Sequence, residues 1–404
     1  MDAKSVGYII AELRKKNNMT QAELSFRLNV SYKTVSKWEN GLGYPEITQF
    51  PEIAKIFGVS VDYLMTGERK GIAVAGNILT DNVKTVNDYP KQGMLANILS
   101  VSRSVGGCVP NTAIDIAKID RSVPLYALGK IGDDEHGRYV ISKLQKYGID
   151  TGKIAVSAKS TTSFSDVMSL PTGERTFFHA RGANAEFSPD DIDLSSLSAR
   201  MLHIGYILLL DSFDKADFEY GTVMARFLHD VKERGIETSI DMVSDSTADY
   251  KKAIVPALKY TDYAIINEIE CCGIWGLEPY GGDGALDISA VKKAMTLTAE
   301  SGVSKKVIVH AKSAGICLDI KSGEFTAVGS LKLPKNAIRG SVGAGDAFCA
   351  GCLYGLYEGF DDKSLLEFAS AAAACNLFSE NSVDGMKTKN EIIEISKQYK
   401  RVKL

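Results

Sequence analysis

The N-terminal part of the chain repeats its apolar positions with the period of an α-helix. Ile9, Ile10 and Leu13 fall on one helical face, and Thr20 with Glu23 three residues on forms a capping box that begins a new helix. We therefore predict a bundle of five short helices joined by tight turns. The bundle is expected within residues 4–66, with its later helices at Thr20–Leu28, from Ser31 to Trp38 or Asn40, at Ile47–Phe57 and at Ser60–Met65.

Beyond Lys70, short apolar runs alternate with helical patterns. This alternation predicts an α/β fold with a mostly parallel, doubly wound sheet. The chain is thus divided into a helical domain, residues 1–69, and a second domain, residues 70–404. The predicted strands are Ile72–Ala75, Pro124–Leu128, Phe164–Ser169, Thr176–His179, Met201–Tyr206, Thr238–Met242, Tyr263–Ile266, Val307–His310 and Gly315–Asp319. The predicted helices include Thr112–Lys118, Gly137–Tyr147, Phe218–Arg234, Ile288–Ser301, Gly345–Glu358 and Ser364–Ser379.

Composition supports this division. A chain of 404 residues exceeds what one ordinary hydrophobic core supports. Its hydrophobic content of 45% and charged content of 24% are typical of a soluble globular protein. Residues 1–70 hold ten basic and eight acidic residues, whereas the rest carries a net charge of −5. A mildly basic unit on an acidic body favours nucleic-acid contact at the N-terminal end.

The cysteines and histidines suggest no disulfide framework and no zinc site. Seven scattered cysteines indicate reduced thiols. Cys349-x-x-Cys352 falls inside a predicted helix, which favours a structural role over redox or metal chemistry. The five histidines show no ligand spacing. The N-terminus has no apolar signal segment, and the longest apolar run, Ile204–Leu210, is too short to span a bilayer. We therefore expect a cytoplasmic protein that does not contact the membrane.

Residues 20–41 read Thr20-Gln21-x-x-Leu24-(x)3-Leu28-x-Val30-Ser31-x-x-Thr34-Val35-Ser36-Lys37-Trp38-Glu39-x-Gly41. This pattern resembles the lambda-repressor-like (XRE) helix-turn-helix family, and the resemblance extends over residues 5–66. Such a motif places the start of its second helix against base edges in the major groove of double-stranded DNA. The residues expected there are Ser31, Tyr32 and Lys33, with Ser36 and Lys37 one turn on.

Gln21 opens the preceding helix, where its amide and the backbone N–H groups could hold a phosphate. The alternative is a helical bundle used for protein contact. One such unit offers few DNA contacts, so the DNA-binding interpretation implies a homodimer.

In the second domain, Gly343-Ala344-Gly345 lacks bulky side chains, so its backbone N–H groups can approach an anion at a helix N-terminus. Asp346 follows in the first helical turn. An anion hole beside a carboxylate is the arrangement that a kinase acting on hydroxyl groups requires. The structural alternative is a tight strand-to-helix turn with a capping aspartate.

Several motifs lie along the second domain. They are Gly106-Gly107-x-x-x-Asn111-x-Ala113, Gly129-x-x-Gly132-Asp133-Asp134-x-x-Gly137, Gly173-Glu174-Arg175-Thr176, Gly182-Ala183-Asn184, Asn267-x-x-Glu270 and the segment Gly343-Ala344-Gly345-Asp346-Ala347-Phe348. Together they resemble the ribokinase-like (PfkB) carbohydrate kinase family over residues 71–395. The resemblance implies a ribokinase-like fold with a small β lid, and phosphorylation of a sugar hydroxyl with ATP and Mg²⁺.

The resemblance also implies residue roles. Asp346 would be the general base, and Gly343, Ala344 and Gly345 the anion hole. Asn267 and Glu270 would organise Mg²⁺ and phosphates through water, with no directly ligating residue assigned. Asp81, Gly107 and Asn111 would form the sugar pocket, although Asp81 could instead be a turn or cap residue.

The sequence departs from the family pattern at three places. Gly340-Ser341 stands where the family has Asp-Thr, so activation by a monovalent cation is not expected to follow from membership. Lys312-Ser313-Ala314-Gly315 replaces a Gly-x-x-Gly loop on the nucleotide side, where Lys312 could reach ATP phosphates or remain a solvated lysine. Asp241-Met242-Val243-Ser244-Asp245 alters the end of a central strand.

The prediction is therefore a DNA-binding domain fused to an ATP-dependent sugar kinase, and the resemblance implies that the kinase dimerises through its lid. Two alternatives stay open: a transcription regulator whose kinase fold only senses a ligand, and a nucleoside kinase.

Overall fold

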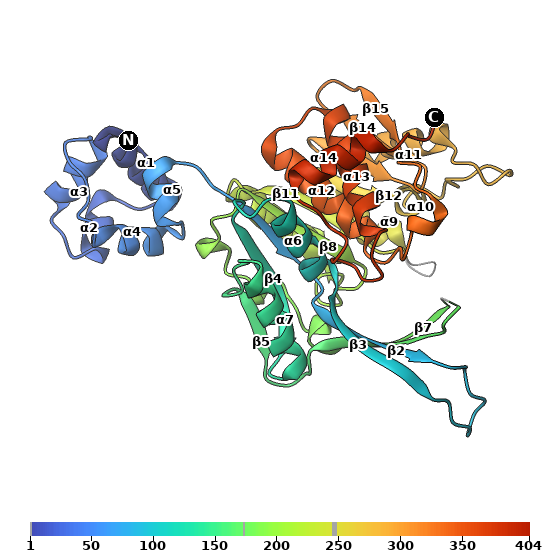
Figure 1. The fold of residues 1–404 in the computed structure, drawn as a ribbon. Coiled ribbons are helices and arrows are strands. Elements are labelled where there is room, and N and C mark those ends of the chain that lie inside the picture. The colour runs from blue at the N-terminus through green and yellow to red at the C-terminus, as the bar shows by residue number, and fades with distance from the viewer. Residues whose placement is uncertain (1, 173, 245–248) are drawn as a thin grey trace. The chain divides into compact units, whose positions relative to one another are not determined.

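The structure is a computed structural model that describes residues 2–172, 174–244 and 249–404. Gly173 of the predicted lid motif and Asp245 of the altered strand end lie outside the described residues. The chain divides into two compact units, one formed by Met1–Gly71 with Asp193–Arg200 and the other by Ile72–Ile192 with Met201–Leu404. Figure 1 shows the course of the chain through both units.

The N-terminal unit is helical, as predicted. Its core is formed by fully buried residues from successive helices, including Ile10, Leu24, Val35, Ile53 and Leu64. The helices are α1 (Ala3–Lys16), α2 (Gln21–Arg27), α3 (Tyr32–Glu39), α4 (Gln49–Phe57) and α5 (Val61–Thr66).

Local sequence sets most of these helix ends. The capping box of Thr20 and Glu23 is present at α2, and the hydroxyl of Ser31 accepts a hydrogen bond from the N–H of Thr34 at α3. Gly58 ends α4 in the left-handed conformation. The predicted start of α4 at Ile47 is wrong, because Ile47 is 88% exposed in the preceding loop and the helix begins at Gln49.

The second unit contains a nine-stranded central sheet within the described residues. The strands run in the order β15 (Phe325–Gly329), β14 (Ala314–Asp319), β13 (Lys306–His310), β12 (Tyr263–Asn267), β11 (Glu237–Met242), β8 (Met201–Ile207), β1 (Ile72–Ala75), β4 (Leu125–Gly132) and β5 (Ile154–Ser157). From β13 to β5 all pairs are parallel, whereas β14 and β15 are antiparallel. The chain builds outward from β1 to β4 and β5 and then returns to β8 on the other side. Ligands bind at such a reversal, outside the carboxyl ends of the strands.

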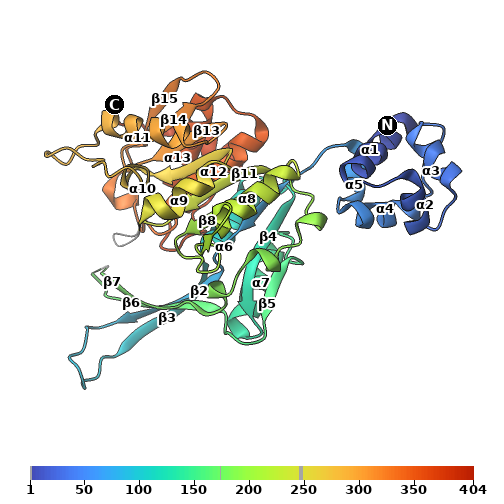
Figure 2. The ribbon, with the colours of Figure 1, turned by 180° about the vertical axis from the view of Figure 1, so that it is seen from behind.

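Helices cover both faces of this sheet, which confirms the doubly wound fold (Figures 1 and 2). One face carries α6 (Cys108–Ile119), α7 (Glu135–Lys146), α12 (Ala344–Glu358) and α13 (Asp362–Asn376), with α14 (Lys389–Gln398) against α13. The other face carries α8 (Val223–Glu233), α9 (Tyr250–Leu258), α10 (Glu268–Gly273) and α11 (Ile288–Glu300). Cys349 and Cys352 are buried within α12, as the structural interpretation predicts.

A separate four-stranded sheet forms the lid and extends away from the central sheet (Figures 1 and 2). Its order is β3 (Ile98–Gly106), β2 (Leu79–Val86), β6 (Ser163–Ser169) and β7 (Arg175–Ala180). Asp81 pairs with Ser104 and Ser165, and Ser165 pairs with His179, so these four residues share one face. Strands β2, β3, β5 and β15 were not among the predicted elements.

The remaining elements are short. They are β9 (Ala216–Asp217), β10 (Gly221–Thr222) and the 3₁₀ turns η1 (Gly182–Ala185), η2 (Pro189–Asp191), η3 (Leu194–Ser196) and η4 (Lys335–Ala337). The predicted helix start at Phe218 is wrong: β9 and β10 occupy this region, and the Thr222 hydroxyl caps α8 by accepting from the N–H of Ala225. Across the described ranges, every helix is too short or too polar to cross a membrane.

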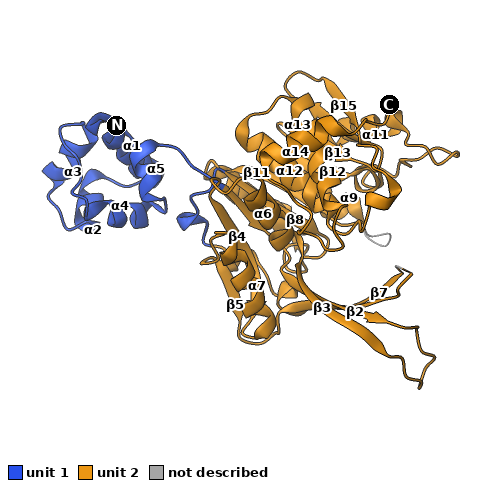
Figure 3. Ribbon diagram, in the orientation of Figure 1, with its two compact units in different colours: residues 1–71, 193–200 blue, residues 72–192, 201–404 orange. Residues whose placement is uncertain are grey.

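Residues 193–200 belong to the helical unit although they lie far along the chain (Figure 3). The guanidinium of Arg69 donates to the carbonyl of Leu197 at 2.5 Å, and the N–H of Lys70 donates to the carbonyl of Ser198 at 3.2 Å. These hydrogen bonds join residues 69–70 to residues 193–200 within the first unit.

Candidate active site

The predicted catalytic segment lies at the N-terminus of α12. Gly343 is the N-cap residue with φ +78°, and a Cβ there would lie 2.6 Å from the Cβ of Ser382. Only glycine suits this conformation and this close approach. Within the described part of the chain, the N–H groups of Gly345 and Asp346 have no hydrogen-bond partner. With the helix dipole behind them, they form a suitable place for an anion.

The carboxylate of Asp346 is buried beside these N–H groups and is held by two donors. The Asn111 side-chain amide donates to Oδ2 at 2.9 Å. The Tyr206 hydroxyl lies 3.1 Å from Oδ1 and 3.0 Å from Oδ2. Burial raises the pKa of Asp346, whereas the hydrogen bonds from Asn111 and Tyr206 act to lower it. A desolvated carboxylate in a fixed orientation is suited to accept a proton.

Asn111, which the resemblance places in the sugar pocket, makes two hydrogen bonds within the protein. Its amide group holds Asp346, and its carbonyl oxygen accepts from the Ser382 hydroxyl at 2.7 Å. Gly107, the N-cap of α6, has φ +88°, and a Cβ there would lie 2.4 Å from the carbonyl oxygen of Asn77. The Gly-Gly-Asn motif therefore brings α6 close enough to support the carboxylate.

Asn267 and Glu270 form a capping box where β12 leads into α10. The Glu270 carboxylate accepts from the backbone N–H of Asn267 at 2.9 Å, from its side-chain amide at 2.7 Å and from the Ser244 hydroxyl at 3.0 Å. Burial raises the pKa of Glu270 to about 7. At the end of β11, Asp241 is also buried, and its pKa lies well above the ordinary value because of burial and the charges of Glu270 and Asp346.

Asp81 lies on the lid, in the row with Ser104, Ser165 and His179. Burial raises the pKa of Asp81 to about 6, against the opposing effects of Arg175 and of a hydrogen bond from Ser165. This is a polar surface with acceptors and donors in one row, as a polyol ligand requires.

Of the two residues predicted on the nucleotide side, only Lys312 is exposed. Gly315 is buried in β14, where a Cβ would lie 3.3 Å from atoms of Phe348 and Leu366. The structure accounts for Gly315 by the packing of α12 and α13 against this strand.

In the helical unit, Tyr32, Lys33 and Lys37 are exposed on α3, with Ser31 at its start and Ser36 half-buried. Gln21 is engaged internally: its amide donates to Glu39 at 2.7 Å. Glu39 also accepts two hydrogen bonds from Arg14, at 2.6 Å and 2.9 Å. At the N-terminus of α2, a DNA phosphate would therefore be contacted by the backbone N–H groups rather than by the Gln21 side chain.

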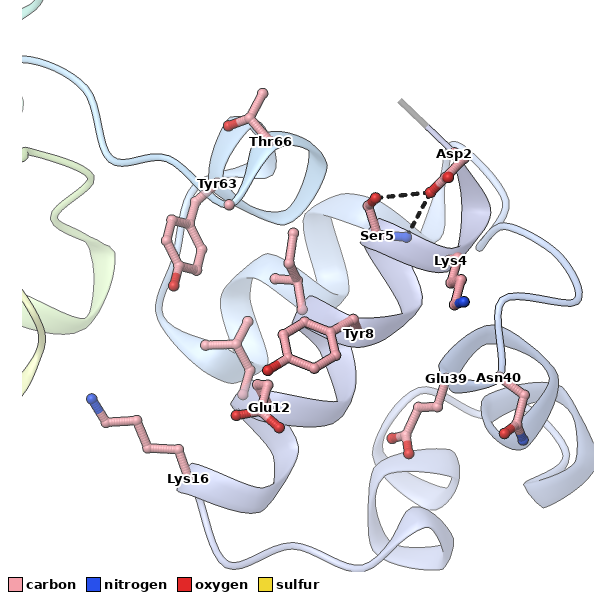
Figure 4. A pocket seen from close by; sticks show the side chains of 13 residues that line it. Asp2, Lys4, Ser5, Tyr8, Glu12, Lys16, Glu39, Asn40, Tyr63 and Thr66 are labelled. Atoms are coloured by element: carbon pink, nitrogen blue, oxygen red, sulfur yellow. Dashed lines mark hydrogen bonds between the residues drawn. The ribbon is translucent and has the colours of Figure 1, made fainter.

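The helical unit also carries an open groove of about 960 Å³ on α1, α5 and the end of α3 (Figure 4). Figure 4 shows Tyr8 and Tyr63 along it, with Glu39 and Asn40 at its α3 side. The groove meets α3 at its C-terminal end, whereas the predicted base-reading residues begin at the N-terminal end. Two residues of its lining, Glu39 and Asn40, are hydrogen-bonded to Gln21 and Ser36, so the groove adjoins predicted DNA contacts.

Residues 69–389 match the model of the pfkB family carbohydrate kinases. The chain belongs to this family. Residues 10–64 match the helix-turn-helix model, so the helical unit is an XRE-type helix-turn-helix domain. Both predicted resemblances are confirmed.

The chain is also similar to individual proteins named as sugar kinases. The chain is 27% identical to a protein named 5-dehydro-2-deoxygluconokinase from Shouchella clausii over 300 residues, which are 72% of this chain and 86% of that one. Arabidopsis thaliana ribokinase, solved with ribose and ATP, has a TM-score of 0.67 at 20% identity and covers 81% of this chain and 99% of its own. A ribokinase II from E. coli, solved with ATP and Mg²⁺, has a TM-score of 0.63 at 20% identity over 81% and 99% of the two chains. These likenesses confirm the ribokinase-like fold of this carbohydrate kinase.

Three residues of the kinase site were missed by the sequence analysis as functional residues. Tyr206 ends a predicted strand, and Ser382 lies in a polar stretch with no periodicity. Asp241 was noted only for a departure from the family pattern. A polar residue at the carboxyl end of a buried strand was the available signal for Tyr206 and Asp241.

The raised pKa of Glu270 predicts that the free energy of unfolding of the kinase depends on pH. Its pKa rises from 4.5 to about 7 on folding, so the folded state keeps a proton that the unfolded state loses. Its contribution to stability therefore falls as the pH rises from about 4.5 to about 7, by up to about 3 kcal/mol. In urea unfolding between about pH 5 and pH 8, the wild type should lose stability relative to Glu270→Gln.

The exposed Glu324→Gln serves as the matched control for loss of a glutamate charge. A constant difference between wild type and Glu270→Gln over this pH range would show that Glu270 does not retain its proton on folding.

Proposed function

We propose that this carbohydrate kinase transfers the γ-phosphoryl group of ATP to a hydroxyl group of a sugar or sugar-like substrate, with Asp346 as the general base. The observation that supports this is the buried Asp346 carboxylate beside the unpartnered N–H groups of Gly345 and Asp346. Phosphoryl transfer needs an acceptor for the hydroxyl proton and positive potential for the phosphate, and this arrangement supplies both.

The reaction is balanced around Asp346. The acceptor hydroxyl gives its proton to the carboxylate while its oxygen forms a bond to the γ-phosphorus. The bond from that phosphorus to the β,γ-bridging oxygen breaks, and ADP leaves with the electron pair. In the proposed anion hole of Gly343, Ala344 and Gly345, the Ala344 N–H already donates to the carbonyl of Ser341 at 3.3 Å. The N–H groups of Gly345 and Asp346 would therefore hold the transferring group, and Lys312 would contact the other phosphates.

ATP and Mg²⁺ are the proposed cofactors. Mg²⁺ commonly binds nucleotide phosphates with few protein ligands and several waters. The Glu270 carboxylate already accepts three hydrogen bonds, which fits contact with the ion through water rather than direct ligation. When bound, the ion would neutralise charge on the phosphates. Asn267 and Glu270 would fix the β12–α10 corner that faces it.

For the substrate, we propose a keto-deoxy sugar acid such as 5-dehydro-2-deoxygluconate. The support is the naming of similar relatives as 5-dehydro-2-deoxygluconokinases. The polar lid row that contains Asp81 suits the hydroxyl groups of such a substrate, and Arg175 supplies a cation near it.

The chemical role of Asp346 is tested by ADP release over a panel of ribose, fructose, 5-dehydro-2-deoxygluconate and adenosine. The sugar acid should give the highest kcat/KM, and Asp346→Asn should lower turnover by about 100- to 10,000-fold because a positioned base is lost. Thermal shift with substrate should persist in Asp346→Asn. Asp283→Asn, in a surface turn, is the matched control. Binding without any turnover would favour a ligand sensor, and adenosine as the best substrate would favour a nucleoside kinase.

We propose that the helix-turn-helix domain binds double-stranded DNA through α3 and regulates transcription. The exposed Tyr32, Lys33 and Lys37 support contact along one side of this helix. Ser31 at its N-terminus and Ser36 would add polar contacts, while Gln21 would act through its helix N-terminus.

Replacing Lys33 and Lys37 with alanine should weaken DNA binding by at least about tenfold, because two phosphate or base contacts are lost. A shift assay with genomic operator fragments measures this. The double variant Lys15→Ala and Lys16→Ala removes the same charge from the end of α1 and should bind DNA more tightly than the α3 variant. Equal losses in the two variants would contradict docking through α3. Kinase turnover should not change in either.

We propose that the kinase forms a homodimer through its lid. Edge strands with exposed apolar residues favour pairing, and Leu99 and Val101 on β3 are 58% and 67% exposed. Phe177 and Phe178 on the other edge strand, β7, are 57% and 60% exposed.

Leu99→Lys with Val101→Lys should convert the dimer to a monomer in light scattering after size exclusion, because charges replace the apolar edge. Phe218→Lys, at an exposed aromatic residue outside the lid, is the control and should leave the mass unchanged. A monomeric wild type, or a dimer in both variants, would contradict the lid interface.

A further inference from the structure

We infer that Tyr206 is a positioning residue for Asp346, placed by a β-bulge so that its hydroxyl fixes the orientation and the ionised form of the carboxylate. This inference rests on the proposed function, in which Asp346 is the base. Tyr206 itself is not proposed to transfer the proton.

The bulge is visible in the pairing of β8 with β11. Ile204 pairs with Ile240, but the next pair joins Ile207 to Met242. Asp241 is thus the one residue between these pairs on β11, whereas β8 has both Gly205 and Tyr206. An extra residue on one strand redirects the side chains beside it, and such bulges are common next to active sites.

The bulge forces Tyr206 into an unusual backbone conformation. Its φ is +62°, and that of Leu208 is +83°. A non-glycine residue in this region costs about 1 kcal/mol, so the surrounding structure must hold it there. The Asp214 carboxylate does so by accepting from the N–H of Leu208 at 3.2 Å and from that of Leu210 at 3.0 Å. The strain is therefore maintained by specific contacts.

The result is a hydroxyl aimed at the carboxylate. The Tyr206 oxygen lies 3.1 Å and 3.0 Å from the two oxygens of Asp346, so its one proton is shared between them. Burial and the nearby negative charge keep the pKa of Tyr206 well above its ordinary value, so the phenol remains a donor. Asn111 reaches only Oδ2, which leaves Tyr206 as the donor to Oδ1.

The surroundings of Asp346 make these donors important. Among the described residues other than Tyr206, the groups whose pKa is raised by the charge of Asp346 are Asp115 and Cys108 on α6, Asp241 on β11 and Cys349 on α12. None of these four groups supplies positive charge. Ionisation of a buried carboxyl in such a place depends on hydrogen bonds to the charged form. Tyr206 supplies one of the two, so its loss should make Asp346 a less available base at neutral pH.

The experiment compares full-length wild type with Tyr206→Phe, which keeps the ring and removes only the hydroxyl. Without that donor the carboxyl holds its proton more tightly, so the acid limb of the pH profile of kcat/KM should move up by about one pH unit. At its plateau, kcat should fall about tenfold with little change in KM, because orientation of the base is lost. Tyr354→Phe is the matched control, since the Tyr354 hydroxyl also donates to a carboxylate, that of Asp120 at 3.2 Å.

A pH profile of Tyr206→Phe that overlays the wild type would overturn the inference and leave the proposed function intact. A lower kcat without a shifted acid limb would also overturn it, because a structural defect alone gives that result.

A second measurement separates failure of the inference from failure of the proposed function. The thermal midpoints of wild type, Tyr206→Phe, Asp346→Asn and the double variant form a double-mutant cycle that needs no turnover. If the wild type lacks kinase activity, the proposed function fails. The cycle then decides the contact: a non-additive midpoint shift supports the Tyr206–Asp346 pairing, and additive shifts overturn it.

Discussion

The kinase site depends on the burial of one carboxylate. Asp346 is only 6% exposed, and a buried charged group is stable only when polar neighbours replace the water it has lost. Those neighbours come from separate parts of the chain: Asn111 on α6, Tyr206 at the end of β8 and, through Asn111, Ser382. Their meeting fixes how α6 and α12 approach the reversal point of the central sheet.

Close backbone approach makes this meeting possible. A side chain at Gly107 would collide with the carbonyl of Asn77, and one at Gly343 would collide with Ser382. The glycines therefore let two helix N-termini and the segment around Ser382 come within hydrogen-bond range of one another. In the proposed reaction the same closeness leaves room for a phosphate at the start of α12. Both the packing and the proposed chemistry therefore require a residue without a side chain at Gly107 and Gly343.

The helix-turn-helix domain and the kinase are each explained by their own contacts. In the helical unit, Arg14 and Gln21 both bind the largely buried Glu39, which ties three helices to one another. That network uses the side chain of a residue predicted to contact DNA. The exposed face of α3 remains available. The side chains of Tyr32, Lys33 and Lys37, rather than that of Gln21, are therefore the ones proposed to contact DNA.

The sequence by itself determined the two families and most regular elements. Hydrophobic periodicity and caps depend on neighbouring residues, so α2, α3 and β1 could be located from local sequence. The lid strands β2 and β3 were not predicted, although Leu99, Val101 and Val105 alternate with serines on β3. Both strands are exposed or only partly buried over most of their length, so polar residues dominate their sequences. Gly343, Gly345 and Asp346 could be assigned to the site from sequence, because they lie within four residues of one another and form a local motif.

Tertiary structure decided the partners of the site. Asn111 and Tyr206 are 235 and 140 residues from Asp346 along the chain, and no local pattern relates them. The aim of Tyr206 depends on the register between β8 and β11, which is set by strands that meet only in the folded sheet. The sequence could therefore name the base, but only the packed sheet and helices could show what holds it.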